Sequence, residues 1–270
     1  MGVKIYIRKL LNKTRWIYYI FASFIVKRAK IDFENHKSFI INIDNAHEYF
    51  RMATFKTKEP EMIEWINSWE IAHGDVFFDI GANIGIYSLY ASTIHSELNV
   101  YSFEPDVFSF PKLVKNLQTN ALIKCKPMCV ALSDSGSLAQ FFCGLTTPGA
   151  GAGSLGVPYP GFGRDGSASY LILSQSLDEL ASKYQIPIPK YMKIDVDGHE
   201  HAILKGAASM LKNEKLRSVM LEIEVFDGST EVIDLMKGYG FSVAEISKWA
   251  EYLVSGGVVR NYLFVRDSVA

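Results

Sequence analysis

The stretch VFFDIGANIGIYSLYAS, which runs from Val76 to Ser92, decides the fold. Three apolar residues lead to Asp79, two glycines stand four positions apart at Gly81 and Gly85, and an apolar pattern with helical spacing follows. This order predicts a buried strand, a tight turn and a helix. In an open parallel sheet, ligands bind outside the carboxyl ends of the strands, where a glycine turn leads into a helix. The sequence therefore predicts a ligand site at this turn.

Similar strand-like segments recur along the chain and alternate with helical patterns. The clearest strands are NVYSFEP at 99–105, YMKIDVD at 191–197 and VMLEIE at 219–224, and FPKLVKNLQTNAL at 110–122 is the clearest helix. Strands that alternate with helices favour an α/β fold, in which a mainly parallel sheet has helices on both faces.

The first 30 residues differ from the rest in charge. They contain eight Lys and Arg residues and no acidic residue, whereas the rest of the chain has a net charge of −9. An acidic body argues against a nucleic-acid-binding domain. The run WIYYIFASFIV at 16–26 is uncharged, but as a helix it is about 16 Å long and too short to cross a bilayer core of about 30 Å. We expect it either to lie in the headgroup region of a membrane or to pack on the domain or a partner chain.

Composition sets the remaining expectations about organisation. A chain of 270 residues, 49% of them hydrophobic, can form either one large α/β domain or one domain with an appendage. The three cysteines have neither C-x-x-C spacing nor a disulfide pattern, so we place the protein in the cytoplasm. Segment 144–170 holds eight glycines and three prolines and predicts a long loop, either a lid or a surface insertion. We divide the chain into a basic, aromatic arm (1–30), a helical region (31–74) and the main domain (75–270).

The glycine turn favours S-adenosylmethionine (SAM) over NAD. The dinucleotide fingerprint G-x-G-x-x-G needs a middle glycine that is absent here. Asp79 would repel a diphosphate, whereas it suits a cationic ligand such as a sulfonium. At the next strand end, Glu104 can accept hydrogen bonds from both hydroxyls of a ribose. At the following one, Ser133 precedes Asp134, which can accept a hydrogen bond from an adenine amino group. Three acids at successive strand ends indicate SAM.

From Asp75 to Glu224 the chain resembles the FkbM-type methyltransferases. The resemblance rests, in order, on DIGANIGIYSLYAS, FEPDVFSFPKLVKNLQTN, VALSD, SLDEL, MKIDVDGHEHAILKGAASML and VMLEIE. It implies a class I methyltransferase fold, with a Rossmann-like seven-stranded sheet whose last strand is antiparallel, and SAM-dependent methylation of a hydroxyl oxygen. It also implies cofactor contacts: Asp79, Gly81, Asn83 and Gly85 on the methionine and ribose side, Glu104 at the ribose, and Ser133 and Asp134 beside the adenine.

Acids and histidines at the fourth strand end are the candidate catalytic groups. Positioning supplies much of the rate of methyl transfer, but an alcohol also needs a base for its proton. The segment KIDVDGHEH at 193–201 and Glu222 on the neighbouring strand supply such groups. The candidates are Asp195, Asp197, His199 and Glu222, with Asp195 and Glu222 as the preferred pair.

These acids have three interpretations. They act as the base, they bind a divalent cation such as Mg²⁺ through oxygen ligands, or, as for Glu200, they stabilise a helix start. We expect Asp195 and Asp197 to share one face of the strand and Lys193 to pair with a strand-end acid. FkbM-type proteins usually read K-I-D-x-E-G-x-E here, so Asp197 and His199 are departures, and the aspartate has a shorter reach.

The leading hypothesis is an O-methyltransferase. Its acceptor is a small molecule or glycan: a sugar, a lipid-linked metabolite or another secondary metabolite, methylated in the cytoplasm. Where the arm contacts lipid, it does so at the inner face of a membrane. One alternative is an NAD-dependent oxidoreductase on a Rossmann-like sheet, which the glycine spacing disfavours. The other is a noncatalytic, membrane-tethered binding protein.

Overall fold

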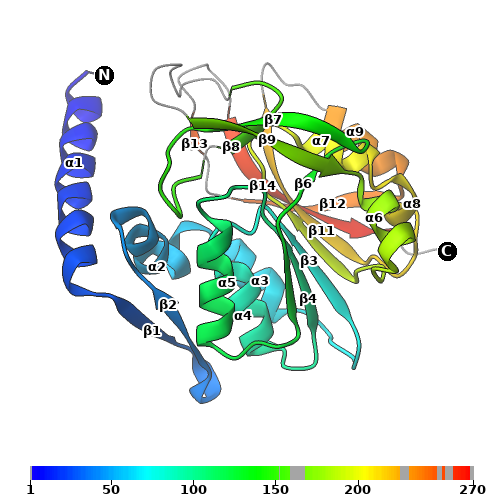
Figure 1. Ribbon diagram of the computed structural model, residues 1–270, viewed down its shortest axis with the longest axis horizontal. Coiled ribbons are helices and arrows are strands. Elements are labelled where there is room, and N and C mark those ends of the chain that lie inside the picture. Colours follow the sequence, from blue (N-terminus) through cyan, green and yellow to red (C-terminus); the bar gives the residue numbers. More distant parts are fainter. Residues whose placement is uncertain are drawn as a thin grey trace.

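The computed structural model describes residues 2–151, 153–158, 168–225, 231–247, 251–252 and 258–267, without the side chains of 2–12, 224–225 and 251–252. The central sheet has the strand order β12-β14-β11-β10-β3-β4-β5, and β13 pairs with β14 (Figure 1). The strands are β3 (Val76–Ile80), β4 (Asn99–Phe103), β5 (Cys125–Met128), β10 (Tyr191–Ile194), β11 (Ser218–Val225), β12 (Phe241–Ile246), β13 (Glu251–Tyr252) and β14 (Val258–Arg266).

The directions of these strands confirm the predicted class I methyltransferase sheet. Neighbours from β5 to β11 are parallel, and β14 is antiparallel to both β11 and β12. The seven-strand path is therefore mainly parallel, with the last strand reversed as expected. All five residues of β3 are buried, because a parallel strand in the middle of such a sheet is covered on both faces.

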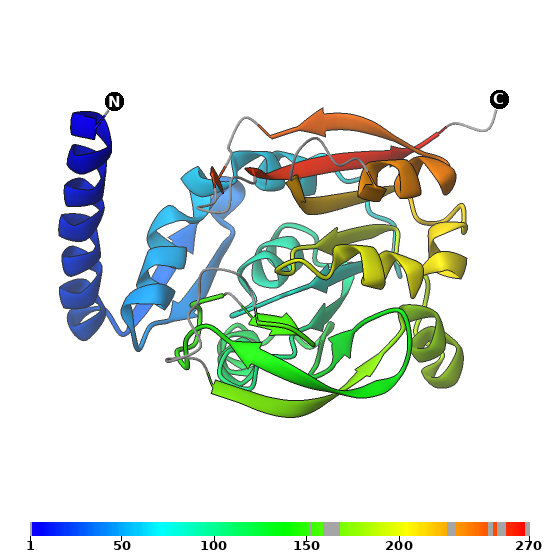
Figure 2. The same cartoon turned by 90° about the horizontal axis from the view of Figure 1, so that it is seen from above.

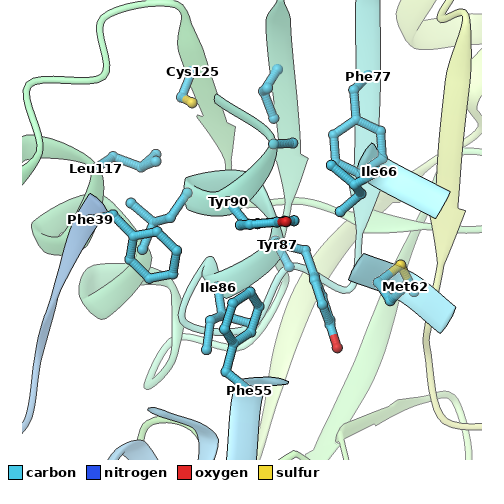
Figure 3. Packing of buried hydrophobic residues seen from close by; sticks show 14 of the residues in the cluster. Phe39, Phe55, Met62, Ile66, Phe77, Ile86, Tyr87, Tyr90, Leu117 and Cys125 are labelled. Atoms are coloured by element: carbon cyan, nitrogen blue, oxygen red, sulfur yellow. The ribbon is translucent and has the colours of Figure 1, made fainter. Parts of the chain in front are cut away.

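Helices cover both faces of the sheet (Figure 2). One face holds α2 (Ala46–Lys58), α3 (Pro60–Asn67), α4 (Ile86–Ile94) and α5 (Phe110–Thr119), and the other holds α6 (Leu177–Tyr184), α7 (Glu200–Lys205), α8 (Ala208–Leu211) and α9 (Glu231–Gly238). Strand β3 serves both hydrophobic cores, because Phe77 packs on the first side while its neighbour Phe78 packs on the second. Figure 3 shows the first core, where Phe55 of α2 lies near Ile86 and Tyr87 of α4.

The predicted glycine-rich loop at 144–170 is in part a strand structure. A second sheet has the order β6-β9-β7-β8, formed by β6 (Ala131–Leu132), β7 (Ser137–Cys143), β8 (Gly153–Leu155) and β9 (Ala168–Gln175). Residues 152 and 159–167 of the predicted loop lie outside the described residues. The expectation of a loop was wrong at β8 and at residues 168–170, where β9 begins. At β8, a Cβ on Gly153 would lie 2.5 Å from the Phe141 ring. The glycine thus allows close pairing with β7 rather than a turn.

The region at 31–74 is not helical throughout, which corrects the prediction. It includes the end of a hairpin formed by β1 (Arg28–Asp32) and β2 (Ser38–Asn42), joined by the short helix η1 (Glu34–His36). Burial alternates over the first four residues of β2, where Phe39 and Ile41 are buried and Ile40 between them is partly exposed, which is the pattern of a strand with one face on the core. The helices of this region are α2 and α3, which follow the hairpin.

The arm forms helix α1 (Gly2–Ile25), which packs on α2 at one edge of the molecule (Figures 1 and 2). The ring of Trp16 lies 4.7 Å from that of His47, and the ring of Tyr19 lies 5.6 Å from that of Phe50. Packing on the domain, one of the two predicted alternatives, therefore occurs. Among the residues that the structure describes, no helix combines the length and apolar character needed to span a bilayer.

Candidate active site

A buried lysine joins the carboxyl ends of the two strands at the centre of the sheet. Lys193 of β10 pairs in register with Asp79 of β3, and its Nζ lies 3.3 Å from Asp79 Oδ1 and 3.0 Å from Asp195 Oδ2. Lys193 also donates a hydrogen bond to the carbonyl oxygen of Gly81 at 3.2 Å. Burial lowers the pKa of Lys193, but the two carboxylates outweigh burial and hold it above its ordinary value. The predicted pairing of Lys193 with a strand-end acid is confirmed.

Asp79 is fully buried beneath the glycine turn. Its Oδ2 accepts a hydrogen bond from Ser88 Oγ at 2.6 Å, and Ser88 Oγ lies 2.6 Å from Ser102 Oγ. Its Oδ1 lies within ion-pair distance of Lys193 without hydrogen-bond geometry. The side chain thus links β3, α4, β4 and β10, and it supports the turn from below.

The two glycines of the turn allow close contacts with neighbouring elements. Gly81 has φ +72°, and a Cβ there would lie 1.9 Å from the carbonyl oxygen of Asp195. Gly85 has φ +85°, and a Cβ there would lie 2.4 Å from Leu113 Cδ1 of α5. Gly85 therefore brings the start of α4 close to α5. Both positions need glycine, since larger residues would be strained and would clash.

Glu104 lies against the glycine turn from the neighbouring strand. Its carboxylate accepts hydrogen bonds from the backbone N–H of Asn83 at 2.5 Å and of Asp106 at 2.8 Å. Asn83 has the left-handed φ of 52°, and its side chain accepts a hydrogen bond from the N–H of Ile84 at 2.9 Å. Burial raises the pKa of Glu104 to about 7. The structure thus joins two residues that the sequence predicts as cofactor contacts.

Ser133, which follows β6 of the second sheet, lies beside His199, which precedes α7. Ser133 Oγ lies 3.0 Å from His199 Nε2 and donates a hydrogen bond to Asp134 Oδ1 at 3.3 Å. Burial lowers the pKa of His199, which favours the neutral ring. His199, predicted as a catalytic candidate, therefore lies with the residues predicted for the adenine.

Asp195 and Glu222 form a hydrogen-bonded carboxyl pair across the ends of β10 and β11. Burial raises the pKa of Asp195, but the charges of Lys193 and Lys58 outweigh it and lower the pKa to about 2. Burial and the charge of Asp195 raise the pKa of Glu222 well above its ordinary value. The raised pKa of Glu222 favours its protonated form and the lowered pKa of Asp195 favours its ionised form, so in this pair Glu222 is the donor and Asp195 the acceptor. The structure brings together the two residues that the sequence analysis prefers as the catalytic pair.

The corner between α2 and α3 adds residues that the sequence analysis missed. Glu59 is 5% exposed, its Oε1 lies 2.6 Å from Lys58 Nζ, and its Oε2 accepts a hydrogen bond from the Tyr87 hydroxyl at 2.5 Å. Two residues on, Glu61 accepts a hydrogen bond at 2.9 Å from Asn261, which pairs in register with Glu222. The charge of Glu59 raises the pKa of Glu222, and the charge of Lys58 lowers the pKa of Asp195. This corner therefore forms a wall of the site beside the carboxyl pair.

The segment after β10 does not continue as a strand. Strand β10 ends at Ile194, so Asp195 and Asp197 lie in a loop and do not share a strand face, which corrects the prediction. Glu200 starts α7 and accepts a hydrogen bond from the N–H of Gly198 at 3.2 Å. No group of three or more His, Cys, Asp or Glu side chains with metal-binding geometry occurs within the described ranges.

The buried carboxyl group of Glu104 predicts how the stability of the ligand-free protein depends on pH. Its pKa rises from 4.5 in the unfolded chain to about 7 in the folded protein, so the folded state retains a proton that the unfolded state releases. The stability that this group contributes is complete below pH 4.5 and falls by on the order of 3 kcal/mol as the pH rises through about 7. Urea unfolding across this pH range measures the fall. Glu104→Gln should make the fall smaller, and an equally steep curve in that variant would contradict the assignment.

Comparison with known proteins gives a family and several relatives. The family model described as the methyltransferase FkbM domain matches residues 79–243. The hexuronic acid methyltransferase AglP of Haloferax volcanii is 31% identical over 179 residues, which cover 66% of this chain and 68% of that protein. The 31-O-demethyl-FK506 methyltransferase FkbM of Streptomyces tacrolimicus is 28% identical over 200 residues, which cover 64% of this chain and 75% of that protein.

The solved structures that match this chain are distant in sequence. The precorrin-6y C5,15-methyltransferase of Geobacter metallireducens has a TM-score of 0.47 and 13% identity, and the match covers 78% of this chain and 89% of that one. TYW2 of M. jannaschii, in complex with AdoMet, has a TM-score of 0.42 and 12% identity, with 89% and 87% coverage.

Proposed function

The chain belongs to the family of FkbM methyltransferases, and on this premise we propose that it transfers the methyl group of SAM to a hydroxyl oxygen of a sugar, a glycan, a lipid-linked or another secondary metabolite. The observation that carries this proposal is the meeting of the glycine turn, Glu104 and the Asp195–Glu222 pair at neighbouring strand ends. The family assignment removes the oxidoreductase alternative. The names of the two relatives refer to a hexuronic acid and to a 31-O-demethyl compound, and both names support an oxygen-rich acceptor.

The residues around the turn fit SAM. Bound SAM supplies a methyl group on a positively charged sulfur. Glu104 is fixed by two backbone N–H groups, and its oxygens keep lone pairs that can accept from two ribose hydroxyls. The backbone of Gly81, Asn83 and Gly85 would hold the methionine end, supported by Asp79 from below. Ser133 and Asp134, joined by His199, would flank the adenine.

Asp195 is the proposed base. It is ionised at neutral pH, and its side chain is 33% exposed, so that an acceptor can reach it. Lys193 and the protonated Glu222 hold its carboxylate in place, and the proton of the acceptor hydroxyl passes to this carboxylate as the methyl group is transferred. Because a carboxylate with a low pKa is a weak base, orientation of the acceptor carries much of the rate. Asp197 lies two residues further in the same loop and is proposed as a second acceptor contact.

The proposed location is the cytoplasm, on the inner face of a membrane. Cys125, Cys129 and Cys143 are free thiols, which suits a reducing compartment. The basic arm supplies the charge for contact with that face.

Calorimetry and a transfer assay test the proposal. The purified protein is titrated with SAM and with its demethylated product, with NAD as control, and each titration is repeated with Mg²⁺. Saturable binding of the two sulfur compounds and not of NAD is expected. Transfer of labelled methyl from SAM is then measured with hexoses, hexuronic acids and their carboxyl-blocked esters. Label on an ester shows that a hydroxyl is the acceptor. Label on the free acid alone would show that the enzyme methylates the carboxyl group to an ester, which would contradict methylation of a hydroxyl. If SAM binding is stronger with Mg²⁺ than without it, a divalent cation takes part in the site.

Removal of the Glu104 carboxylate is expected to weaken SAM binding. Glu104→Ala removes a charged acceptor from the ribose hydroxyls, so the binding free energy should fall by about 1 to 3 kcal/mol. Calorimetry with SAM measures the change. Glu97→Ala is the matched control, because Glu97 lies before β4, at its opposite end, and its side chain is 55% exposed. Equal affinity of the Glu104 and Glu97 variants would exclude Glu104 from the cofactor site.

A further inference from the structure

Helix α1 carries an apolar stripe that the described part of the protein leaves exposed. The exposed fractions are 53% for Ile17, 39% for Ile20, 66% for Phe21, 71% for Phe24 and 82% for Ile25. These positions follow the spacing i, i+3, i+4, i+7 and i+8, so the five side chains form one face of the helix. We call this face the outer stripe.

The opposite face of α1 is fixed by aromatic contacts with α2. The Trp16 ring lies 6.1 Å from the Phe50 ring, and the Tyr19 ring lies 5.8 Å from the Tyr49 ring. Ser23, on the same side, is 4% exposed. The helix therefore cannot rotate its stripe onto the domain without losing these contacts. In both ribbon views α1 lies at the edge of the molecule with α2 between it and the central sheet (Figures 1 and 2).

The positive charges around the outer stripe favour a partner with negative charge. Lys13, Arg15, Lys27 and Arg28 flank the stripe and are exposed, and the first 30 residues contain no acid. Lys27 Nζ lies 5.9 Å from the Phe24 ring centroid, so one cation stands directly at the stripe. A bilayer with anionic headgroups offers an apolar interior beneath negative charge. A second copy of α1 would instead bring like charges together.

We propose that the outer stripe of α1 docks into the surface of an anionic membrane, with the helix axis parallel to the bilayer plane. The aromatic and aliphatic side chains enter the boundary between headgroups and acyl chains, and the lysines and arginines contact lipid phosphates. Docking itself does not depend on the reaction. One consequence does rest on the proposed function: α2 joins α1 to the Lys58–Glu59 corner of the site, so a docked enzyme would hold its site near the membrane, where a lipid-linked acceptor lies.

Vesicle co-sedimentation of the full chain tests the proposal. The protein is mixed with vesicles of phosphatidylcholine alone and of phosphatidylcholine with phosphatidylglycerol, and strong binding is expected only to the second. The double variant Phe21→Asp and Phe24→Asp should bind the anionic vesicles at least about tenfold more weakly than the wild type, because each change places a charge in the apolar layer. The matched control makes the same change at Leu171 and Leu173 of β9, which are 67% and 64% exposed, and should bind like the wild type.

A second variant and a second measurement separate the remaining outcomes. Neutralising Lys13, Arg15 and Lys27 with glutamine should remove the preference for anionic vesicles. If the Phe21 and Phe24 variant binds anionic vesicles as well as the wild type does, the proposal is overturned. Loss of vesicle binding in the β9 control would overturn it as well. So would dimerisation in light scattering that the stripe variant abolishes without any vesicle binding, since the partner would then be a second copy. SAM titration of each variant reports on the reaction site separately, so failure of docking and failure of the proposed function are distinguishable.

Discussion

Replacement of Asp195 by asparagine is expected to lower the rate of methyl transfer by about 100- to 10,000-fold, the range for loss of a positioned general base. Asparagine has nearly the same shape and can still accept a hydrogen bond from Lys193, so the fold and SAM affinity should change little. It cannot take the proton of the acceptor hydroxyl at neutral pH. Initial rates with labelled SAM measure the loss, and calorimetry with SAM in the same preparation checks the cofactor site.

The matched control for Asp195→Asn is Glu222→Gln, the same carboxyl-to-amide change in the partner. Because burial and Asp195 keep Glu222 protonated, a glutamine amide can replace it as a donor to Asp195. Glu222→Gln should therefore cost far less activity than Asp195→Asn. If the order is reversed, Glu222 is the base. If Asp195→Asn retains the wild-type rate, the proton leaves by a route outside this pair.

Much of the fold could be predicted because its signals are local. The run VFFDI followed by a glycine turn predicted β3 and the helix after it, and both are observed. Burial of β3 on both faces leaves a continuous apolar run that sequence alone reveals. The hairpin of β1 and β2 was missed because β1 (RAKID) is mostly polar and buries only Ile31, so it carries no apolar run that marks a strand. Strand β8 was missed because Gly153 serves close packing, and a glycine-rich sequence usually predicts a loop.

The candidate site was predictable where its residues follow strands. The pairing of Lys193 with strand-end acids and the meeting of Asp195 with Glu222 both follow from parallel neighbours ending at one edge. Glu59 precedes a proline at a helix start, where an acid is usually a solvated helix-end residue, so no local pattern marks its contact with Tyr87. That contact depends on how α3 lies over the sheet, which periodicity does not specify.

Replacement of Lys193 by methionine is expected to destabilise the protein by about 3 to 5 kcal/mol, the cost of breaking a buried ion pair from one side. Methionine fills similar space, but it leaves the fully buried carboxylate of Asp79 without its cation and removes the bond to the Gly81 carbonyl. These contacts hold the ends of β3 and β10 together beneath the glycine turn. Urea unfolding at constant pH measures the change in the free energy of unfolding.

Two variants separate charge pairing at Lys193 from simple loss of a lysine. Lys190→Met changes a lysine just before the same strand, at its opposite end, where the side chain is 22% exposed and pairs with Asp75 at 2.9 Å. Solvent weakens that pair, so a loss of about 1 kcal/mol or less is expected. Adding Asp79→Asn to Lys193→Met removes the unpaired charge, and the asparagine can still accept from Ser88, so the double variant should be more stable than Lys193→Met alone. If the double variant is no more stable, the loss comes from packing around the missing ammonium group. If Lys193→Met costs no more than Lys190→Met, the buried cation does not hold the turn, and the support of the cofactor loop must come from Ser88 and the glycine contacts.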